Sequence, residues 1–112
     1  MGVSVLLAVL VAAAVPVLKE AKPGLRAKAK VTYEAAQKAA LAKVPGAEIV
    51  EAELEREHGK LVYSFDLKSA GKDGIDEVQV DAKTGAVLSV EHEDAAAEAA
   101  ERKKDEAEKA RK

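Results

Sequence analysis

The sequence predicts a small α+β domain: one helix packs on an antiparallel β-meander of three to four strands, between an apolar N-terminal segment and a charged helical tail. Several short runs alternate apolar with polar residues, as half-buried strands do. One alanine-rich stretch with helical spacing precedes them. The loops between the alternating runs are short, which makes neighbouring strands antiparallel.

Composition narrows the possible functions. The chain has 112 residues and a formal net charge of −2, so we expect one folded domain and no nucleic-acid binding. It has no cysteine, which excludes a disulfide framework, a thiolate nucleophile and a zinc knuckle. Its three aromatic residues, Tyr33, Tyr63 and Phe65, leave a light core of aliphatic residues and alanine.

Residues 1–18 are predicted to be a signal peptide or signal anchor. Residues 3–18 are apolar except for Ser4 and Pro16, a run short of the ~20 residues of a membrane span but sufficient for an export signal. Small residues at 12–14 suit a signal peptidase. No Lys or Arg precedes the run, which disagrees with the positive-inside tendency, although a start upstream of Met1 would remove that disagreement. The alternative is a buried helix. We expect an extracytoplasmic location, with membrane contact only through this segment.

Residues 19–30 are predicted to be a basic linker. Pro23 and Gly24 break any helix, and five basic residues stand against the single acidic Glu20. The linker would lie against anionic headgroups or act as a solvated spacer.

The folded domain is expected over residues 31–92 and begins with a helix. Thr32 is a good N-cap, and Glu34 suits the positive end of the helix dipole. Pro45 and Gly46 end the helix at about Val44. The stripe expected to face the sheet contains Ala36, Ala39, Ala40 and Val44.

Strands are predicted over residues 48–57, 61–68, 77–81 and 86–91, with His58 and Gly59 in the first turn. In the first strand we expect Val50, Ala52 and Leu54 to face the helix. The opposite face is expected to be wet and acidic, and it would contain Glu51, Glu53, Glu55, Ser64, Asp66, Glu77 and Gln79.

The last two strands are joined by a turn with a defined mechanism. The Asp81 side chain can accept a hydrogen bond from a backbone N–H two residues further on, and Gly85 can take the positive φ that closes the turn. Asp81, Thr84 and Gly85 are therefore assigned to structure rather than to chemistry.

Residues 93–112 are predicted to be a charged tail. From about Asp94 the sequence consists almost wholly of Ala, Glu, Lys, Arg and Asp, and pairs such as Glu98 with Arg102 favour a helix. Alanine offers this helix little to bury, so we expect a solvated tail, with an interaction helix as the alternative.

The spacing of the domain resembles the PepSY family over about residues 31–91. The matching positions are Ala36-x-x-Ala39-Ala40-x-x-x-Val44-Pro45-Gly46, Gly59-Lys60-x-x-Tyr63-x-Phe65, and Val78-x-Val80-Asp81-x-x-Thr84-Gly85-x-Val87-Leu88.

This resemblance implies a small exported bacterial protein. PepSY domains occur in extracytoplasmic proteins and in propeptides of thermolysin-like proteases, and regulation of peptidases is the role proposed for them. The family shares no catalytic residues. Ala39 departs from the family pattern, where a larger aliphatic residue is usual, which implies a thinner helix contact.

The residues also give no reason to expect an enzyme, a metal or a cofactor. None of Ser64, Ser69 and Ser89 lies in a nucleophile elbow, and His58 falls in a hairpin turn. His92, in Glu91-His92-Glu93-Asp94, offers too few anchored ligands for a specific metal site. We therefore expect neither catalytic nor metal-binding residues.

Two functions remain. The first is a binding module for a peptidase or a peptide, which would add a strand along the free edge formed by Val87, Leu88, Ser89 and Val90. Basic partners would be attracted by Glu51, Glu53 and Glu55, whose strand also has a free edge but is guarded by charge. Alternatively the tail or a second copy covers the last strand. The second function is a structural or cation-binding envelope protein that uses the acidic face and the tail.

Overall fold

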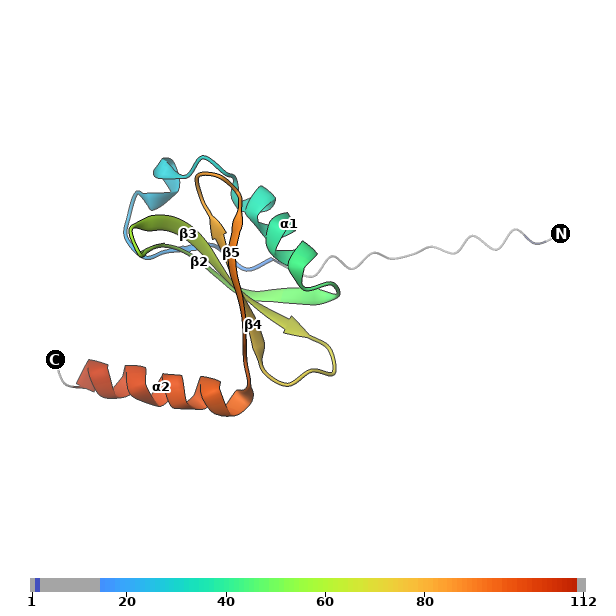
Figure 1. Cartoon of the computed structure of the whole chain (residues 1–112), viewed down its shortest axis with the longest axis vertical. Coiled ribbons are helices and arrows are strands. Elements are labelled where there is room, and N and C mark those ends of the chain that lie inside the picture. The colour runs from blue at the N-terminus through green and yellow to red at the C-terminus, as the bar shows by residue number, and fades with distance from the viewer. Residues whose placement is uncertain (1, 3–14, 111–112) are drawn as a thin grey trace.

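The computed structural model describes Gly2 and residues 15–110, so most of the predicted signal segment lies outside the described residues. One sheet organises the described chain (Figure 1). Its strands, in spatial order, are β1 (Lys19–Glu20), β2 (Ala47–Glu57), β3 (Lys60–Ser69), β4 (Ile75–Asp81) and β5 (Val87–Glu93). The helices are the 3-10 helix η1 (Leu25–Lys28), α1 (Tyr33–Lys43) and α2 (Ala95–Ala110).

The α+β class is confirmed, but the strand count and the single helix are not. β2 to β5 form the predicted antiparallel meander. The fifth strand is β1, which pairs in parallel with β2 through Lys19↔Glu53 and Glu20↔Leu54. A two-residue strand has no alternation to recognise, which is why the sequence pattern missed it. The sheet is therefore mixed, and the edge of β2 predicted to be free is partly covered.

Residues 19–30 are part of the fold, so their prediction as a linker is wrong. Leu25 is buried at 5% exposure, and Leu18 just before the segment is buried at 8%. The Glu20 carboxylate accepts hydrogen bonds from Gly24 N (3.2 Å) and Arg26 N (3.1 Å), which holds η1 against β1. Leu25, a single leucine in a basic stretch, gives no periodic signal, yet it anchors the segment to the core.

α1 lies on one face of the sheet and encloses the main core (Figure 1). Thr32 caps it as expected, since its Oγ1 accepts from Ala35 N at 3.1 Å. Ala36 and Ala40 are fully buried and bring the helix close to the strands. Beneath α1, the three aromatic rings stack with centroids 6.0–6.2 Å apart and consist of Tyr33, Tyr63 and Phe65.

The hydroxyl groups of the two tyrosines tie the chain before α1 to this core. Tyr63 Oη donates to Val31 O, and Tyr33 Oη donates to Pro16 O, each at 2.6 Å. Pro16 and Leu18, at the end of the predicted signal segment, therefore contact the folded domain.

A register shift in β2 changes which side chain reaches the core. Val50 was predicted to face α1, but it is 44% exposed, while Ile49 is buried at 6%. The shift lies between Ile49 and Glu51 in the pairing with β3. A β-bulge inserts one residue and reverses the alternation beyond it, so the period-2 pattern was correct only from Glu51 onward.

Both hairpin turns follow from their residues. Between β2 and β3, His58 (φ 50°) and Gly59 (φ 77°) take the two positive φ values that a two-residue turn requires. Between β4 and β5, Asp81 Oδ1 accepts from Lys83 N (2.8 Å) and Thr84 N (3.2 Å), and Gly85 has a φ of 81°. The hydrogen bond from Lys83 N–H holds the pKa of the Asp81 carboxyl below its usual range.

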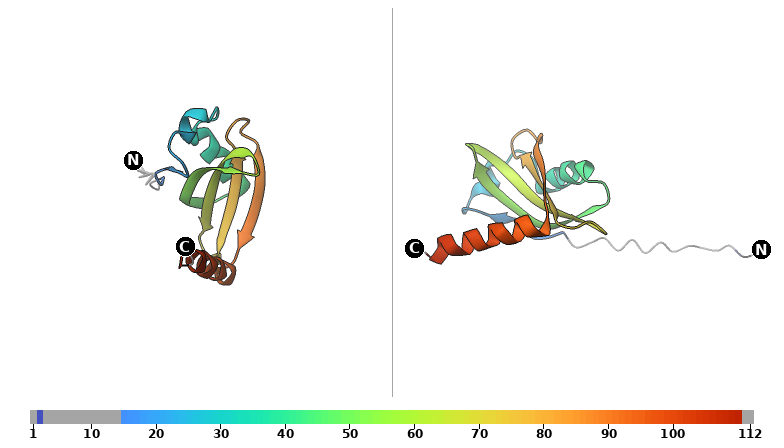
Figure 2. Two further views of the ribbon diagram at one scale, coloured as in Figure 1. Left: turned by 90° about the vertical axis from the view of Figure 1, so that its left-hand side faces the viewer. Right: turned by 60° about the horizontal axis from the view of Figure 1, so that its bottom comes forward.

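α2 lies on the face of the sheet opposite α1 (Figures 1 and 2). It follows β5 after Asp94, whose Oδ1 accepts from Ala97 N at 2.7 Å as an N-cap does. Within the described residues, no helix combines the length and the apolar character that crossing a membrane requires.

Candidate binding surfaces of the sheet

β5 provides the first candidate surface, because it is the last strand of the sheet. On one side it pairs with β4, through Val78↔Val90 and Gln79↔Ser89, and no strand of the described chain pairs with its other side. Leu88 and Val90 are 40% and 47% exposed, although both are large apolar side chains. Val87 and Ser89 are half-buried.

A second register shift explains why Leu88 is exposed. Ser89 pairs with Gln79 and Val87 pairs with Val80, which leaves Leu88 without a partner of its own on β4. The edge therefore combines open backbone groups with two apolar side chains, the features that strand addition uses. The structure brings together the four residues predicted for this role.

The acidic face of the sheet is the second candidate surface. Along one line across four strands, the cross-strand pairs are Glu51↔Asp66, Asp66↔Glu77 and Glu77↔Glu91. Four carboxylates thus lie side by side in one row, which we call the carboxylate row. Like charges in directly opposite positions are destabilising, so this row is a local electrostatic cost.

The next line across the sheet is polar but mostly uncharged. Ser64 Oγ donates to Glu55 Oε1 at 2.8 Å, and Gln79 Nε2 donates to Glu57 Oε2 at 2.7 Å. Ser89 Oγ donates to Gln79 Oε1 at 3.4 Å. These hydrogen bonds hold two of the glutamates in place and hold the Gln79 side chain on this face.

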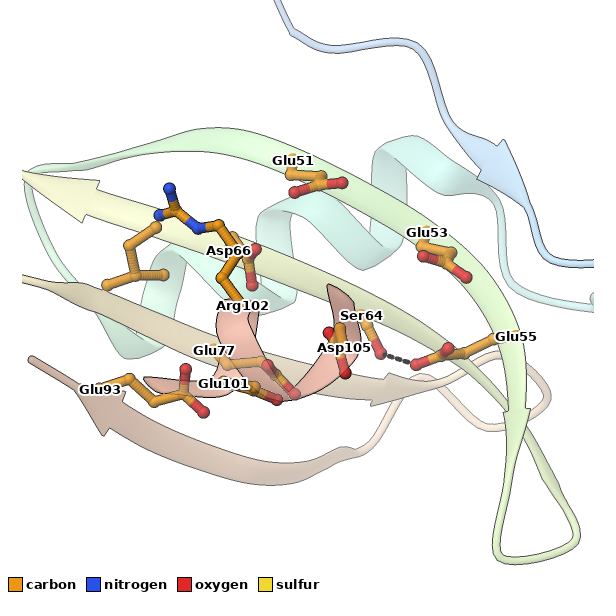
Figure 3. Close-up of a pocket in the computed structure, with 11 residues that line it drawn as sticks. Glu51, Glu53, Glu55, Ser64, Asp66, Glu77, Glu93, Glu101, Arg102 and Asp105 are labelled. Atoms are coloured by element: carbon orange, nitrogen blue, oxygen red, sulfur yellow. Dashed lines mark hydrogen bonds between the residues drawn. The ribbon is translucent and has the colours of Figure 1, made fainter. Parts of the chain in front are cut away.

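α2 closes the acidic face from outside, over a cavity of about 440 Å³. Figure 3 shows Glu101, Arg102 and Asp105 of α2 in front of the sheet, and all three line the cavity together with Asp66. Arg102 is the one basic side chain among the described residues that line the cavity. The lining residues are Glu51, Glu53, Glu55, Ser64, Asp66, Ile75, Glu77, Glu93, Glu101, Arg102 and Asp105.

Crowded carboxylates on this face bind protons more tightly than usual. Burial, with Asp66, Glu93 and other carboxylates nearby, raises the pKa of Glu77 to about 7. Burial, together with Glu55, also raises the pKa of Glu53. The Lys19 ammonium lowers the pKa of Glu53 and so opposes this rise. Its Nζ lies 3.3 Å from Oε1 of the neighbouring Glu51. Glu77 is therefore poised to change its charge near neutral pH.

The remaining candidate residues are dispersed. His92 Nδ1 lies 2.8 Å from Asp76 Oδ1 across the β4–β5 pair, and His58 lies in the hairpin turn. Ser64 is bonded to Glu55 and Ser89 to Gln79, so neither is paired with a histidine. In the part of the chain that the structure describes, no three His, Cys, Asp or Glu side chains are grouped to hold a metal ion.

Sequence reasoning placed the acidic residues on one face but missed the contribution of α2. The missing signal was present in the tail, where Asp105 follows Glu101 by four residues and Arg102 by three, the spacing of one helix face. The charges of these three residues did not indicate that this helix face would lie over the carboxylates of the sheet.

Comparison with known families decides the classification. A family model described as "Peptidase propeptide and YPEB domain", PepSY, matches residues 30–91. The chain belongs to the PepSY family. The match covers α1, β2 to β4 and β5 as far as Glu91, and with them residues 87–90 of the β5 edge and the carboxylate row, but not α2. No curated protein and no solved structure matches the chain. Membership places the domain among propeptide-like, peptidase-related extracytoplasmic modules.

Proposed function

We propose that this PepSY domain is a non-enzymatic extracytoplasmic module that binds a peptidase by adding a strand of the partner to β5. The partner segment would run along Val87, Leu88, Ser89 and Val90, and binding would inhibit the peptidase or assist its folding, as a propeptide does. The observation that supports this best is the open edge of β5 with exposed Leu88 and Val90.

Glu51, Glu53 and Glu55 contribute to approach rather than to the final contact. They lie on β2, away from the β5 edge, so their charges attract basic partners from a distance. Reversing these charges should therefore mainly slow association and reduce its salt dependence, with a smaller effect on dissociation.

The test uses a purified thermolysin-like protease as the probe. We expect the full chain to bind it and to slow its hydrolysis of a peptide substrate. Leu88→Lys and Val90→Lys should each weaken binding by about tenfold or more, because lysine on an edge opposes strand pairing and removes the apolar contact.

The matched control is Val50→Lys. Val50 is 44% exposed, like Val90 at 47%, but it lies on β2. Equal binding by all folded variants, or equal loss in the Val50→Lys control, would contradict docking along β5. Failure of the wild-type chain to bind the protease would contradict the peptidase-binding role itself.

The location is a separate part of the proposal. Residues 1–30, fused to a reporter active only outside the cytoplasm, should give an active reporter, because residues 3–18 supply an apolar run with small residues at 12–14. A silent reporter, with a chain extended upstream of Met1 also silent, would contradict export.

A further inference from the structure

The way α2 is held on the sheet differs from ordinary helix packing. Every α2 side chain whose exposure the structure describes is exposed, so the helix buries no large apolar surface. It lies instead over the carboxylate row and adds Glu101 and Asp105 to it. Arg102 is the basic residue that the described part of α2 places at the cavity, and it supplies the attraction, while none of the described α2 side chains is buried to offset the repulsion.

From this arrangement we propose that α2 is a pH-dependent strap: it closes over the acidic face in mildly acidic solution and leaves it as the pH rises through neutrality. The strap does not depend on the β5 edge or on any partner. Its physical basis is the balance between one guanidinium and the charge on the carboxylates beneath and around it.

Glu77 is the group whose charge decides this balance. It stands within the carboxylate row on β4, with acidic neighbours in every element packed against that face. The charged groups that face it are Glu51, Glu53 and Glu55 of β2, Asp66 of β3, Glu91 and Glu93 of β5, and Glu101, Arg102 and Asp105 of α2.

The direction of the pH effect follows from linkage. The pKa of Glu77 is raised to about 7 from an ordinary 4.5, and Glu101 of α2 is one of the charges that raise it. The docked state therefore binds the proton more tightly than the open state, so docking is strongest at low pH. It weakens as the pH rises through the raised pKa of Glu77, about 7, and stays weakened above it.

The start of α2 is fixed while the rest can move. Glu93 pairs with Ile75, and Asp94 caps the helix at Ala97 N. Gly74 lies directly against this junction, because a Cβ there would collide with the carbonyl oxygen of Glu93 and stand 2.8 Å from Asp94 Cα. The pivot of the strap is therefore held between the β3–β4 loop and the end of β5.

Paramagnetic relaxation in the full chain tests the strap directly. The chain has no cysteine, so Lys104→Cys places a single nitroxide on α2, at an exposed position outside the cavity lining. At pH about 5 the label should broaden the backbone amide signals of β2 and β3 on the acidic face. At pH about 8 the broadening should fall, corresponding to a roughly threefold or greater loss in the docking constant, because ionised Glu77 repels Glu101 of α2.

Three variants identify the groups responsible. Glu77→Gln should keep the broadening at both pH values, because the titrating charge is gone. Arg102→Gln should lose the broadening at both pH values, because the guanidinium that attracts the carboxylates is gone. Lys103→Gln, a neighbouring change of equal charge outside the cavity lining, should behave like the unsubstituted chain.

The ascorbate-reduced label provides the diamagnetic reference, and unchanged amide shifts in α1 show that each variant is folded. Broadening that is absent at both pH values, or equal at both in the unsubstituted chain, would overturn the strap. So would pH dependence that persists in Glu77→Gln, or an equal loss in Arg102→Gln and Lys103→Gln.

Discussion

The two long helices lie on opposite faces of one sheet and are held there by different forces. α1 buries Tyr33, Ala36 and Ala40 against an apolar face. None of the described side chains of α2 is buried, and the helix faces the carboxylates of the sheet. The comparison teaches that burial against apolar side chains fixes a helix, whereas charge contacts hold one conditionally.

The same strands create both environments. In β3, Tyr63, Phe65 and Leu67 face α1 while Ser64 and Asp66 face α2, because successive side chains point to opposite faces. One face is thus a core and the other a solvated acidic surface. Differences between the helices therefore arise from alternate residues of the same strands.

The largest effect is expected from placing the same charge in the two helices. Ala40→Asp buries an unpaired carboxylate at a fully buried position and should cost about 3 kcal/mol or more of unfolding free energy. Ala99→Asp, at an exposed position of α2, should cost about 0.5 kcal/mol through helix propensity. Urea unfolding measures both. Equal costs would break the comparison between the helices.

The second-largest loss of stability is expected from a change in the β4–β5 turn. Gly85 has a φ of 81°, so Gly85→Val should cost about 1–2 kcal/mol, since a β-branched residue resists that conformation. Gly85→Ala should cost less, because alanine tolerates positive φ better than valine does. A urea midpoint equal to that of the unsubstituted chain in Gly85→Val would contradict the role of this turn.

Glu77→Gln should have a smaller effect that depends on pH. Because its pKa is raised to about 7, ionised Glu77 destabilises the fold progressively as the pH rises from about 4.5 to about 7. The glutamine variant should therefore have a higher urea midpoint than the unsubstituted chain at pH 8 and an equal one at pH 4. A difference that is the same at both pH values would assign the effect to packing instead of charge.

The smallest effect on stability is expected at the β5 edge. Leu88→Lys and Val90→Lys change exposed side chains and should alter the unfolding free energy by about 0.5 kcal/mol or less. Thermal unfolding of both variants checks this. A loss of several kcal/mol would show that these side chains belong to the core rather than to an exposed edge.

Much of the fold follows from sequence because its signals are local. Thr32 caps a helix by its own hydroxyl, and Asp81 opens a turn by its own carboxylate. The alternation in β3 places Tyr63 and Phe65 in the core without knowledge of any partner.

What the sequence could not predict depends on contacts between distant residues. β1 exists because Lys19 and Glu20 meet β2, and Val50 is exposed because the pairing shifts beside it. The carboxylate row requires the register of three strand pairs, and the position of Arg102 requires the path of α2 over the sheet. None of these is encoded in a short pattern of residue types.

Amide hydrogen exchange of the full chain tests the difference between the helices most directly. We expect the slowest amides of α1, such as those of Ala40 and Leu41, to exchange only with global unfolding, since their helix face is buried. Amides of α2 around Arg102 should exchange through local opening, with free energies far below the global value and lower still at pH 8 than at pH 6, after correction for intrinsic exchange rates. Protection in α2 equal to that in α1 at both pH values would contradict the account.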